Sequence, residues 1–445
     1  MSAIALVLAE MGHEVSGVDI RERQVLERLR STGVDIHIGH DRAHVVGCDA
    51  VTASTAIPAD LDELDEARRR SIPTLSRADM LAAICARAKT LAVAGTHGKT
   101  TTTSMLMLML ARSGLRPGFV IGGDVTDMGT GAQWTGGEWF VVEADESDGT
   151  HLRLPVHGTV LTNVDLDHLD HYGSFEAIAD SFERYLAGIT GPKLVCIDDG
   201  GAAAVAARRI GAGDDVITYG TSSSATYRAV DLRPGGGSFS FAVERAGRHL
   251  VDVTLPLRGV HNVRNATGAL ALAVEIGVVP GEAADALAAF GGVARRFDVR
   301  GVDRGVTLVD DYAHLPAEID AVLRAARDSG DGWKRIVAVF QPNRFNRMAE
   351  MWRDYADAFG AADVVVLTDI YASGTEPIPG VTGKLVVNAV LDAHPSTRVV
   401  WLPRRDDLVT FLARTLEDGD VCISMGCGDV ASLPDEVLAE RRSVR

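Results

Sequence analysis

The sequence predicts an α/β protein built from three domains. The chain has 445 residues, and at roughly 150 residues per domain this length suggests about three domains. Its 46 glycines and an aromatic content of only 5% favour many tight turns between strands and helices. Short apolar runs that predict buried strands alternate with amphipathic helix patterns along the chain, which is typical of parallel sheets covered by helices.

Residues 1–85 predict a Rossmann-like first domain that lacks its beginning. A helix is expected over residues 3–11 and a strand over residues 13–19, an order that matches the second half of a βαβ dinucleotide-binding unit. No strand and no Gly-rich turn precede Met1 in this sequence. We therefore expect the chain to start inside the first helix of a truncated domain, and we expect a further buried strand over residues 45–54.

Residues 86–293 predict a central domain of the P-loop-like kind. A strand is expected over residues 90–94, a Gly-rich turn over 95–100 and a helix over 101–112. This strand–turn–helix order is the context in which phosphate-binding loops occur. The other elements expected are strands at 140–143 and 160–163, antiparallel hairpins between 231 and 257, and an Ala-rich helix at 262–276.

Residues 294–445 predict a second Rossmann-like domain. We interpret the segment 290–301, which carries Gly, Arg and other charged residues, as the boundary that precedes it. Helix patterns separate five apolar runs that predict buried parallel strands. These strands are expected at 306–309, 336–340, 364–367, 399–402 and 421–425.

The composition excludes several classes of function. There are 44 basic and 61 acidic residues, so the net charge is −17, which argues against a general nucleic-acid binder. No apolar run approaches the ~18 residues that a membrane span needs, so we expect no membrane partner. The five cysteines form no C-x-x-C pair, which favours a reduced, cytoplasmic location without disulfides.

The strongest functional signal is the Gly-rich turn. Backbone N–H groups at such a turn can hold phosphates, its lysine can neutralise their oxygens, and the hydroxyl that follows can bind Mg²⁺. The usual first glycine is replaced by Val93, and the alternative is an ordinary turn before a helix. The candidate nucleotide-binding residues are Gly95, Thr96, His97, Gly98, Lys99, Thr100 and Thr101.

Acidic segments follow the next two expected strands. The first is Glu143-Ala144-Asp145-Glu146-Ser147-Asp148, and the second, residues 165–171, holds three aspartates and two histidines. Doubly wound sheets bind ligands outside the carboxyl ends of their strands, and carboxylates there suit a Mg²⁺–nucleotide site. The alternatives are a solvated acidic loop for the first segment and a polar helix-capping loop for the second.

Polar segments also mark the third domain. Arg295-Arg296-Phe297-Asp298 lies at its boundary, Asp310-Asp311-Tyr312-Ala313-His314 follows its first strand, and residues 341–347 follow its second. Two arginines three apart, Arg344 and Arg347, suit bidentate binding of a small carboxylate. A salt-bridged linker and loop-capping surface arginines are the alternatives. The residues alone thus indicate an ATP- and Mg²⁺-dependent enzyme with a cleft between domains two and three.

The motifs in their order resemble the Mur ligases of peptidoglycan synthesis. The matching segments are G-T-H-G-K-T-T, E-A-D-E-S-D, T-N-V-D-L-D-H-L-D, H-N-V-R-N-A-T, R-R-F-D, D-D-Y-A-H and F-Q-P-N-R-F-N-R, which together span most of the chain. The resemblance implies a UDP-sugar-binding domain, a central ATPase domain and a C-terminal domain that brings the amino acid. It implies that ATP phosphorylates the lactyl carboxylate of UDP-N-acetylmuramate, and that the amine of L-alanine attacks the acyl phosphate.

The resemblance also implies roles for individual residues. Lys99 and Thr100 would serve the ATP phosphates, Glu143 and His168 would match Mg²⁺-site residues together with Thr100, and Asn262 and Asn265 would lie near the adenine. Arg296 and Asp311 would serve the nucleotide across the domain junction. The pocket for the amino acid and the muramoyl carboxylate would contain Tyr312, His314, Arg344 and Arg347.

Two alternatives remain, one within this family's reactions and one without activity. The family usually has His-His where this chain has His314-Leu315, and His where it has Asn343. A ligase that recycles a tripeptide onto the same UDP-sugar is the nearest alternative, although F-Q-P-N-R-F-N-R favours the alanine reaction. An inactive nucleotide-binding relative is the other, against which the presence of Lys99, Glu143 and His168 argues. A monomer or weak homodimer is expected.

Overall fold

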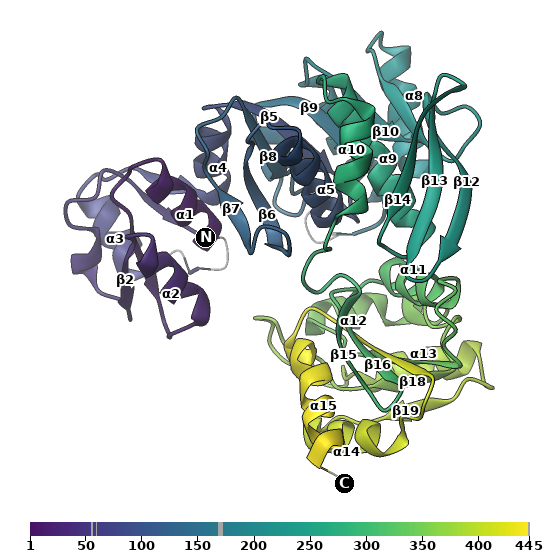
Figure 1. The fold of residues 1–445 in the computed structure, drawn as a ribbon. Helices are drawn as coiled ribbons and strands as arrows, with labels where there is room; N and C mark the ends of the chain where they lie inside the picture. Colours follow the sequence, from purple (N-terminus) through teal and green to yellow (C-terminus); the bar gives the residue numbers. More distant parts are fainter. Residues whose placement is uncertain (55–56, 59, 168–171, 444–445) are drawn as a thin grey trace. The chain divides into compact units, whose positions relative to one another are not determined.

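The computed structural model describes residues 1–54, 57–58, 60–167 and 172–443. The chain divides into two compact units (Figure 1). The first unit contains residues 1–231, 241–255 and 264–291, and the second contains residues 232–240, 256–263 and 292–445. The α/β class predicted from the sequence is confirmed in both units, because each contains a sheet rich in parallel pairs.

Residues 1–85 form two small parallel sheets with helices around them. β1 pairs with β2, and β3 pairs with β4. The elements are α1 (Ser2–Glu10), β1 (Ser16–Asp19), α2 (Gln24–Ser31), β2 (Asp35–Ile38), the 3₁₀ turn η1 (Arg42–Val45), β3 (Val51–Ala53), α3 (Asp62–Arg69), β4 (Thr74–Ser76) and α4 (Arg77–Cys85).

The strand expected over residues 45–54 is therefore wrong in its first half. Asp41 accepts a hydrogen bond from the Ala43 N–H and caps η1. Gly47 then adopts φ +87°, a conformation that breaks an extended strand. Only β3 forms, and its residues are half-buried.

A ten-stranded sheet organises the central part of the chain. Its order is β14-β13-β12-β11-β10-β9-β5-β8-β6-β7. The strands are β5 (Lys89–Ala94), β6 (Gly118–Val125), β7 (Thr130–Gln133), β8 (Trp139–Glu143), β9 (Val156–Leu161), β10 (Lys193–Cys196), β11 (Ile217–Gly220), β12 (Tyr227–Gly235), β13 (Ser238–Arg245) and β14 (Arg248–Leu255). Two-residue turns join β12, β13 and β14, which confirms the predicted hairpins.

Helices cover both faces of this sheet. One apolar core joins β5, β8 and β9 to α7 and α8, whereas α5 packs against α10 (Figure 1). The helices are α5 (Lys99–Arg112), η2 (Thr150–Arg153), α7 (Phe175–Ala187), α8 (Gly200–Gly211), α9 (Val260–Glu275) and α10 (Pro280–Ala288).

The first helix after the Gly-rich turn is buried over most of its length. Every residue from Thr100 to Leu110 in α5 is buried. The hydroxyls of Thr102, Thr103 and Ser104 donate to the carbonyl oxygens four residues earlier, at 2.7–2.8 Å, so the polar run has its hydrogen bonds inside the helix. The predicted phosphate-binding helix is thus fixed in the core of the first unit.

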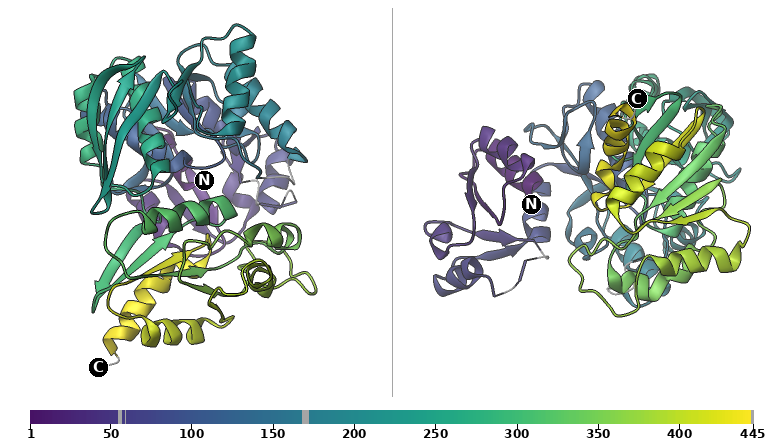
Figure 2. Two further views of the ribbon diagram at one scale, coloured as in Figure 1. Left: turned by 90° about the vertical axis from the view of Figure 1, so that its right-hand side faces the viewer. Right: turned by 90° about the horizontal axis from the view of Figure 1, so that it is seen from below.

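The second unit contains a six-stranded sheet in the order β15-β16-β20-β17-β18-β19. Helices lie on both of its faces (Figure 2), and each face has its own apolar core. The strands are β15 (Asp298–Asp303), β16 (Val306–Asp311), β17 (Arg335–Phe340), β18 (Val364–Leu367), β19 (Val399–Trp401) and β20 (Asp420–Met425). The helices are α11 (Pro316–Arg327), α12 (Phe345–Met351), η3 (Trp352–Tyr355), α13 (Lys384–Ala393), α14 (Arg405–Thr415), η4 (Asp429–Ser432) and α15 (Leu433–Ser443).

The five predicted strands of this unit are present, with one correction to their burial and one added strand. β19 is only half-buried because it is the edge strand next to β18. The segment 290–301, interpreted as a boundary, contains the start of β15, which pairs antiparallel with β16. β15 has no apolar run, because its residues are exposed or half-buried at the edge of the sheet.

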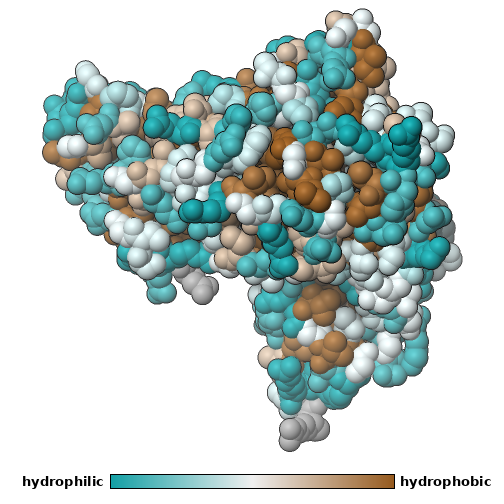
Figure 3. Space-filling model, turned by 45° about the horizontal axis from the view of Figure 1, so that its top comes forward, coloured by the Kyte–Doolittle hydropathy of each residue, from teal (hydrophilic) through white to brown (hydrophobic). Residues whose placement is uncertain are grey.

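Figure 3 shows the hydropathy of one face of the molecule. Hydrophilic residues cover much of the face in Figure 3, and hydrophobic residues gather there in separate patches. Among the described residues, none of the helices combines the length and the apolar character that a membrane crossing requires.

Candidate active site

The Gly-rich turn follows the central strand of the ten-stranded sheet. β5 lies between β8 and β9, and all three run parallel. The register pairs Val93 with Glu143 and Ala94 with Leu161. The loops that leave the carboxyl ends of these strands therefore meet at one edge of the sheet, where doubly wound folds bind ligands.

Two glycines give the turn its shape. Gly95 adopts φ +128°, and a Cβ there would overlap the Thr162 hydroxyl and lie 2.9 Å from the Asn163 carbonyl oxygen. Gly98 adopts φ +80° as the N-cap of α5, and a Cβ there would lie 3.0 Å from Asn265 Nδ2. Both positions need glycine, and the N–H groups that begin α5 remain directed along the helix axis for an anion.

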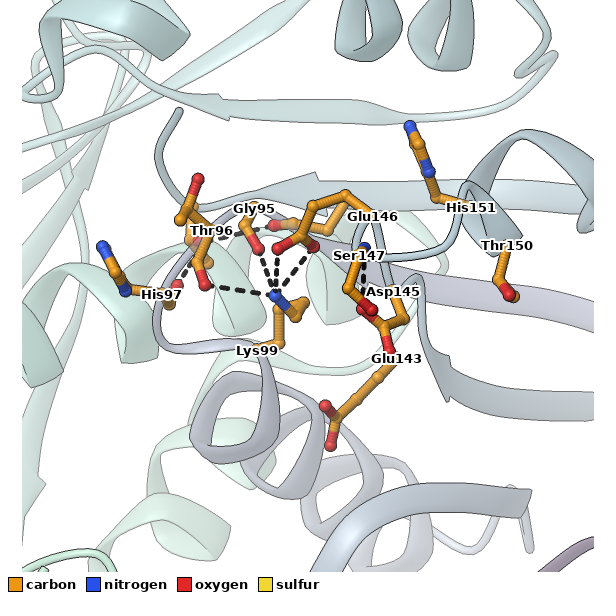
Figure 4. Close-up of polar contacts among 12 residues, drawn as sticks. Gly95, Thr96, His97, Lys99, Glu143, Asp145, Glu146, Ser147, Thr150 and His151 are labelled. Atoms are coloured by element: carbon orange, nitrogen blue, oxygen red, sulfur yellow. Dashed lines mark hydrogen bonds and ion pairs between the residues drawn. The ribbon is translucent and has the colours of Figure 1, made fainter. Parts of the chain in front are cut away.

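Lys99 lies inside this turn and is largely buried. Its side chain is 15% exposed, and its Nζ donates to the Gly95 carbonyl at 2.7 Å and to the Thr96 carbonyl at 3.1 Å. It also pairs with both Glu146 oxygens, at 2.9 and 2.8 Å (Figure 4). Burial opposes its charge, but the fields of Glu146 and Asp145 outweigh that cost and raise the pKa of Lys99.

Thr100 and Glu143 form the candidate magnesium site. The Thr100 hydroxyl donates to Glu143 Oε2 at 3.2 Å, and Glu143 Oε1 accepts the Gly122 N–H at 2.6 Å. A hydroxyl and a carboxylate beside a phosphate loop are oxygen ligands that Mg²⁺ accepts together with nucleotide phosphates. These two residues therefore fit the ion that the sequence predicts.

The third residue predicted for that site, His168, lies outside the described residues. Within the described residues, no group of three or more His, Cys, Asp or Glu side chains forms a metal cluster.

Residues after β9 fix the other side of the turn. Asn163 accepts the His97 N–H at 2.8 Å through Oδ1 and donates to the His97 carbonyl at 2.9 Å. His97 Nε2 lies 3.3 Å from Asp165 Oδ2, and this hydrogen bond lowers the pKa of Asp165. The predicted adenine-side residue Asn265 is buried beside Gly98, so the structure brings Lys99, Thr100, Glu143 and Asn265 to one place.

Asn262 belongs to a segment of the second unit. Its Nδ2 donates to the Arg258 carbonyl at 2.8 Å. Arg258 in turn pairs with Asp331 at 2.6 Å and lies over the Phe297 ring at 4.7 Å.

Asp311, at the end of β16, is a buried carboxyl group among the second unit's candidate residues. It is 4% exposed, and it accepts the Phe297 and Ala313 N–H groups at 2.7 Å each. Burial raises its pKa to about 6, against the opposing field of Arg296. Arg296 lies over the Tyr312 ring at 5.1 Å, so three predicted residues, Arg296, Asp311 and Tyr312, lie together.

The predicted substrate residues at the ends of β16 and β17 have defined partners. Arg347 Nη1 donates to Asn343 Oδ1 at 3.1 Å, and Arg344 adopts φ +62° at the start of α12. His314 Nδ1 lies 3.3 Å from Glu318 Oε2, and its carbonyl accepts the Tyr355 hydroxyl at 2.8 Å.

Several site residues were missed in the sequence. Glu146 lies within the acidic segment, where the pattern did not distinguish it from its neighbours. Asn163 and Gly122 hold His97 and Glu143 through hydrogen bonds between segments far apart in the chain. Arg295 pairs with Asp310 at 3.0 Å and donates to the Gly426 carbonyl at 2.7 Å. Glu146, Asn163 and Arg295 all lie within the sequence motifs quoted above, but only the folded structure shows which residues they contact.

Comparisons with family models place the chain in a known family. The model described as "Mur ligase family, catalytic domain" matches residues 1–89, "Mur ligase middle domain" matches residues 93–273, and "Mur ligase, glutamate ligase domain" matches residues 295–428. The chain belongs to the Mur ligase family. The predicted resemblance is thereby confirmed, and so is the three-domain α/β architecture.

Two named relatives align with this Mur ligase over 98% or more of its length. It is 41% identical over 447 residues to the UDP-N-acetylmuramate--L-alanine ligase of Geobacter sp. (strain M21), covering 100% of this chain and 96% of the relative. It is 44% identical over 441 residues to the ligase of the same name from Acidothermus cellulolyticus, covering 98% and 92%.

Two solved structures are similar to the Mur ligase described above. The UDP-N-acetylmuramate-alanine ligase of Thermotoga maritima superposes with a TM-score of 0.83 at 26% identity, covering 100% of this chain and 97% of that one. A murein peptide ligase from Psychrobacter arcticus gives a TM-score of 0.68 at 25% identity, with the same coverage.

Proposed function

We propose that this Mur ligase joins L-alanine to UDP-N-acetylmuramate at the expense of ATP. The observation that carries the proposal is the β5–α5 turn, in which Gly95, Gly98 and Lys99 form a phosphate loop beside the Thr100–Glu143 pair. Relatives more than 40% identical over the full chain bear the name of that reaction. ATP as the phosphoryl donor and Mg²⁺ as its counterion fit the donor set at this turn.

Each part of the chain has a proposed task. Residues 1–85 bind the UDP-sugar, residues 86–293 bind ATP, and residues 294–445 bring the amino acid. Gly95, Thr96, His97, Gly98, Lys99, Thr100 and Thr101 hold the nucleotide phosphates. Asn262, Asn265 and Arg296 complete the nucleotide site, and Tyr312, His314, Arg344 and Arg347 hold the amino acid and the muramoyl carboxylate.

The chemistry that the residues support is carboxylate activation. Lys99 donates to the oxygens of the phosphoryl group in transfer to the lactyl carboxylate, where negative charge is spread over the equatorial oxygens. Thr100, Glu143 and His168 are proposed to hold Mg²⁺, which would offset further negative charge. The amine of alanine then attacks the acyl phosphate, a C–N bond forms, and phosphate leaves with the C–O electron pair.

The second candidate function is the joining of a tripeptide to the same UDP-sugar. The chain is similar over its full length to a murein peptide ligase, and this similarity is the reason to consider the tripeptide reaction as well. It differs from the alanine reaction only in the amine, so the two functions share the phosphate loop and the sugar carboxylate.

The test is ADP release by the full chain with ATP, Mg²⁺ and UDP-N-acetylmuramate. L-alanine, glycine, L-serine and the tripeptide L-alanyl-γ-D-glutamyl-meso-diaminopimelate are supplied one at a time. We expect ADP release with L-alanine, weaker release with glycine and serine, and none with the tripeptide. Preference for the tripeptide would assign the recycling reaction, and no release with any amine would contradict both functions.

A further inference from the structure

The ammonium group of Lys99 is surrounded by more acceptors than it has hydrogens to donate. Four acceptors surround Nζ at 2.7–3.1 Å: the Gly95 and Thr96 carbonyls and the two Glu146 oxygens. An ammonium carries three N–H donors. A phosphate that needs Lys99 must therefore replace one of the acceptors already present.

Glu146 is the acceptor that can leave. The two carbonyls belong to the turn itself, which Asn163 fixes by two hydrogen bonds to His97. The Glu146 carboxylate is on a rotatable side chain, although its backbone is held by the Tyr172 hydroxyl at 2.7 Å. At 3% exposure it is also too buried for solvent to screen its charge from an incoming phosphate.

We propose that Glu146 is a positioning residue that holds Lys99 in place of the nucleotide phosphates and gives it up when they bind. The inference rests on the proposed ATP site and adds a residue that changes partners during turnover. Because Lys99 has three N–H donors, it cannot serve the Glu146 oxygens and the phosphate oxygens fully at the same time. The carboxylate therefore lowers affinity for nucleotides that reach Lys99, and its return to Lys99 favours release of the product.

Calorimetric binding of three nucleotides to the full chain tests this exchange. The ligands are a non-hydrolysable ATP analogue, ADP and AMP, with Mg²⁺ present. Glu146→Gln keeps the shape and one acceptor oxygen but removes the charge. We expect about tenfold tighter binding of the ATP analogue and ADP, the scale of a lost charge-assisted contact. AMP should bind as to the parent, because it lacks the phosphates that Lys99 would meet.

Asp148→Asn is the matched control from the same loop. Asp148 accepts the Thr150 N–H at 3.0 Å and lies 3.8 Å from Arg77, so neutralising it removes a nearby carboxylate that pairs with a different cation. Its affinities for the three nucleotides should equal those of the parent. Thermal melting followed by circular dichroism verifies that both variants are folded. If Glu146→Gln does not fold, Glu146→Asp, which shortens the side chain, should tighten ADP binding in the same direction.

A double-mutant cycle with Lys99→Met tests whether Glu146 changes nucleotide affinity through Lys99 or by acting on the nucleotide directly. We expect Lys99→Met to weaken ADP binding and Glu146→Gln to add no more than twofold on that background. A full tenfold gain without Lys99 would overturn the positioning role, since the carboxylate would then repel the nucleotide directly. Unchanged or weaker ADP binding by Glu146→Gln, or by Glu146→Asp in its place, would also overturn the inference. Parent-like ADP binding by Lys99→Met would instead overturn the proposed ATP site.

Discussion

The phosphate loop of the first unit and the arginine-bearing turns of the second unit reach left-handed backbone conformations with different residues. In the loop, Gly95 and Gly98 take φ +128° and +80°, which glycine adopts without steric cost. In the second unit, Arg295, Phe297 and Arg344 take φ +64°, +48° and +62°. Each such non-glycine residue costs on the order of 1–3 kcal/mol and persists only where its surroundings hold it.

The partners that hold these residues explain the difference. Arg295 pairs with Asp310 and donates to the Gly426 carbonyl, and the Phe297 N–H donates to Asp311. The loop of the first unit takes its positive φ values at glycines and is held by Asn163, whereas the second unit takes them at non-glycine residues held by carboxylates and a carbonyl. We therefore expect changes in the loop to act locally on phosphate chemistry, and changes in the second unit to act through charge and position.

The largest effect is expected for Lys99→Ala. Loss of a donor to the transferring phosphoryl group should lower kcat by roughly 10²–10³-fold, or about 3–4 kcal/mol. Steady-state ADP release measures it. The change also leaves Glu146 buried without its main cation, so Lys99→Ala combined with Glu146→Gln is the variant in which stability should return toward that of the parent. Near-parental turnover by Lys99→Ala would contradict the phosphate-loop assignment.

The second largest effect is expected for Gly95→Ala, which should lower both the free energy of unfolding and the affinity for nucleotide. The added methyl group overlaps the Thr162 hydroxyl and approaches the Asn163 carbonyl, at a φ of +128°. The strain and overlap should cost about 3 kcal/mol of unfolding free energy, measured by urea denaturation. Gly114→Ala is the control, because φ is also positive there, at +78°, and its Cβ meets no atom within 4 Å. Equal losses at the two glycines would show that backbone strain alone accounts for the effect.

The sequence predicted the loop of the first unit well because its determinants are local. A strand, two glycines, Lys99 and Thr100 lie within a dozen residues, and β5 and α5 form where the apolar run and the helix pattern predicted them. It could not show that Glu146 pairs with Lys99, because the pairing depends on the register between β5 and β8.

The second unit was harder to predict at its edges than in its core. The buried strands β16, β17, β18 and β20 were evident from apolar runs. β15 was missed because the segment 290–301, which contains its start, carries Gly, Arg and other charged residues and was interpreted as a boundary. The positive φ values of Arg295, Phe297 and Arg344 leave no sign in the sequence, because no glycine stands at those positions.

Asp311 should give the second unit a pH dependence of its own. Burial raises its pKa from 3.8 to about 6, so between pH 4 and pH 6 the unfolded chain loses this proton before the folded chain does. The folded state then binds more protons, and the contribution of Asp311 to stability falls as pH rises through that window. The fall is on the order of 2–3 kcal/mol.

The contribution of Asp311 is measured by comparing the free energy of unfolding of the parent with that of Asp311→Asn. The amide cannot ionise, although it places an N–H group near one of the two backbone donors that Asp311 accepts. That cost does not depend on pH. Urea denaturation at pH 4.5 and pH 7.5 should show that the parent loses its advantage over the variant as pH rises. A constant difference between the two proteins would show that Asp311 titrates normally.

The smallest effect is expected for replacement of the arginines in the second unit by lysine. Arg347 is oriented by Asn343 Oδ1 at 3.1 Å, and a guanidinium held in this way can bind a carboxylate by two parallel hydrogen bonds. Lysine keeps the charge but loses that geometry, so Arg347→Lys should raise the KM for the amine or the sugar carboxylate about fivefold, which is near 1 kcal/mol, with little change in kcat. Arg344→Lys should likewise raise the KM for the substrate whose carboxylate Arg344 binds.

Arg327→Lys is the control, because Arg327 pairs with Asp363 at 2.7 Å on an exposed part of the same unit. Steady-state kinetics with each substrate varied in turn distinguishes which carboxylate each arginine binds, and unchanged KM values for both substrates would remove that arginine from the site.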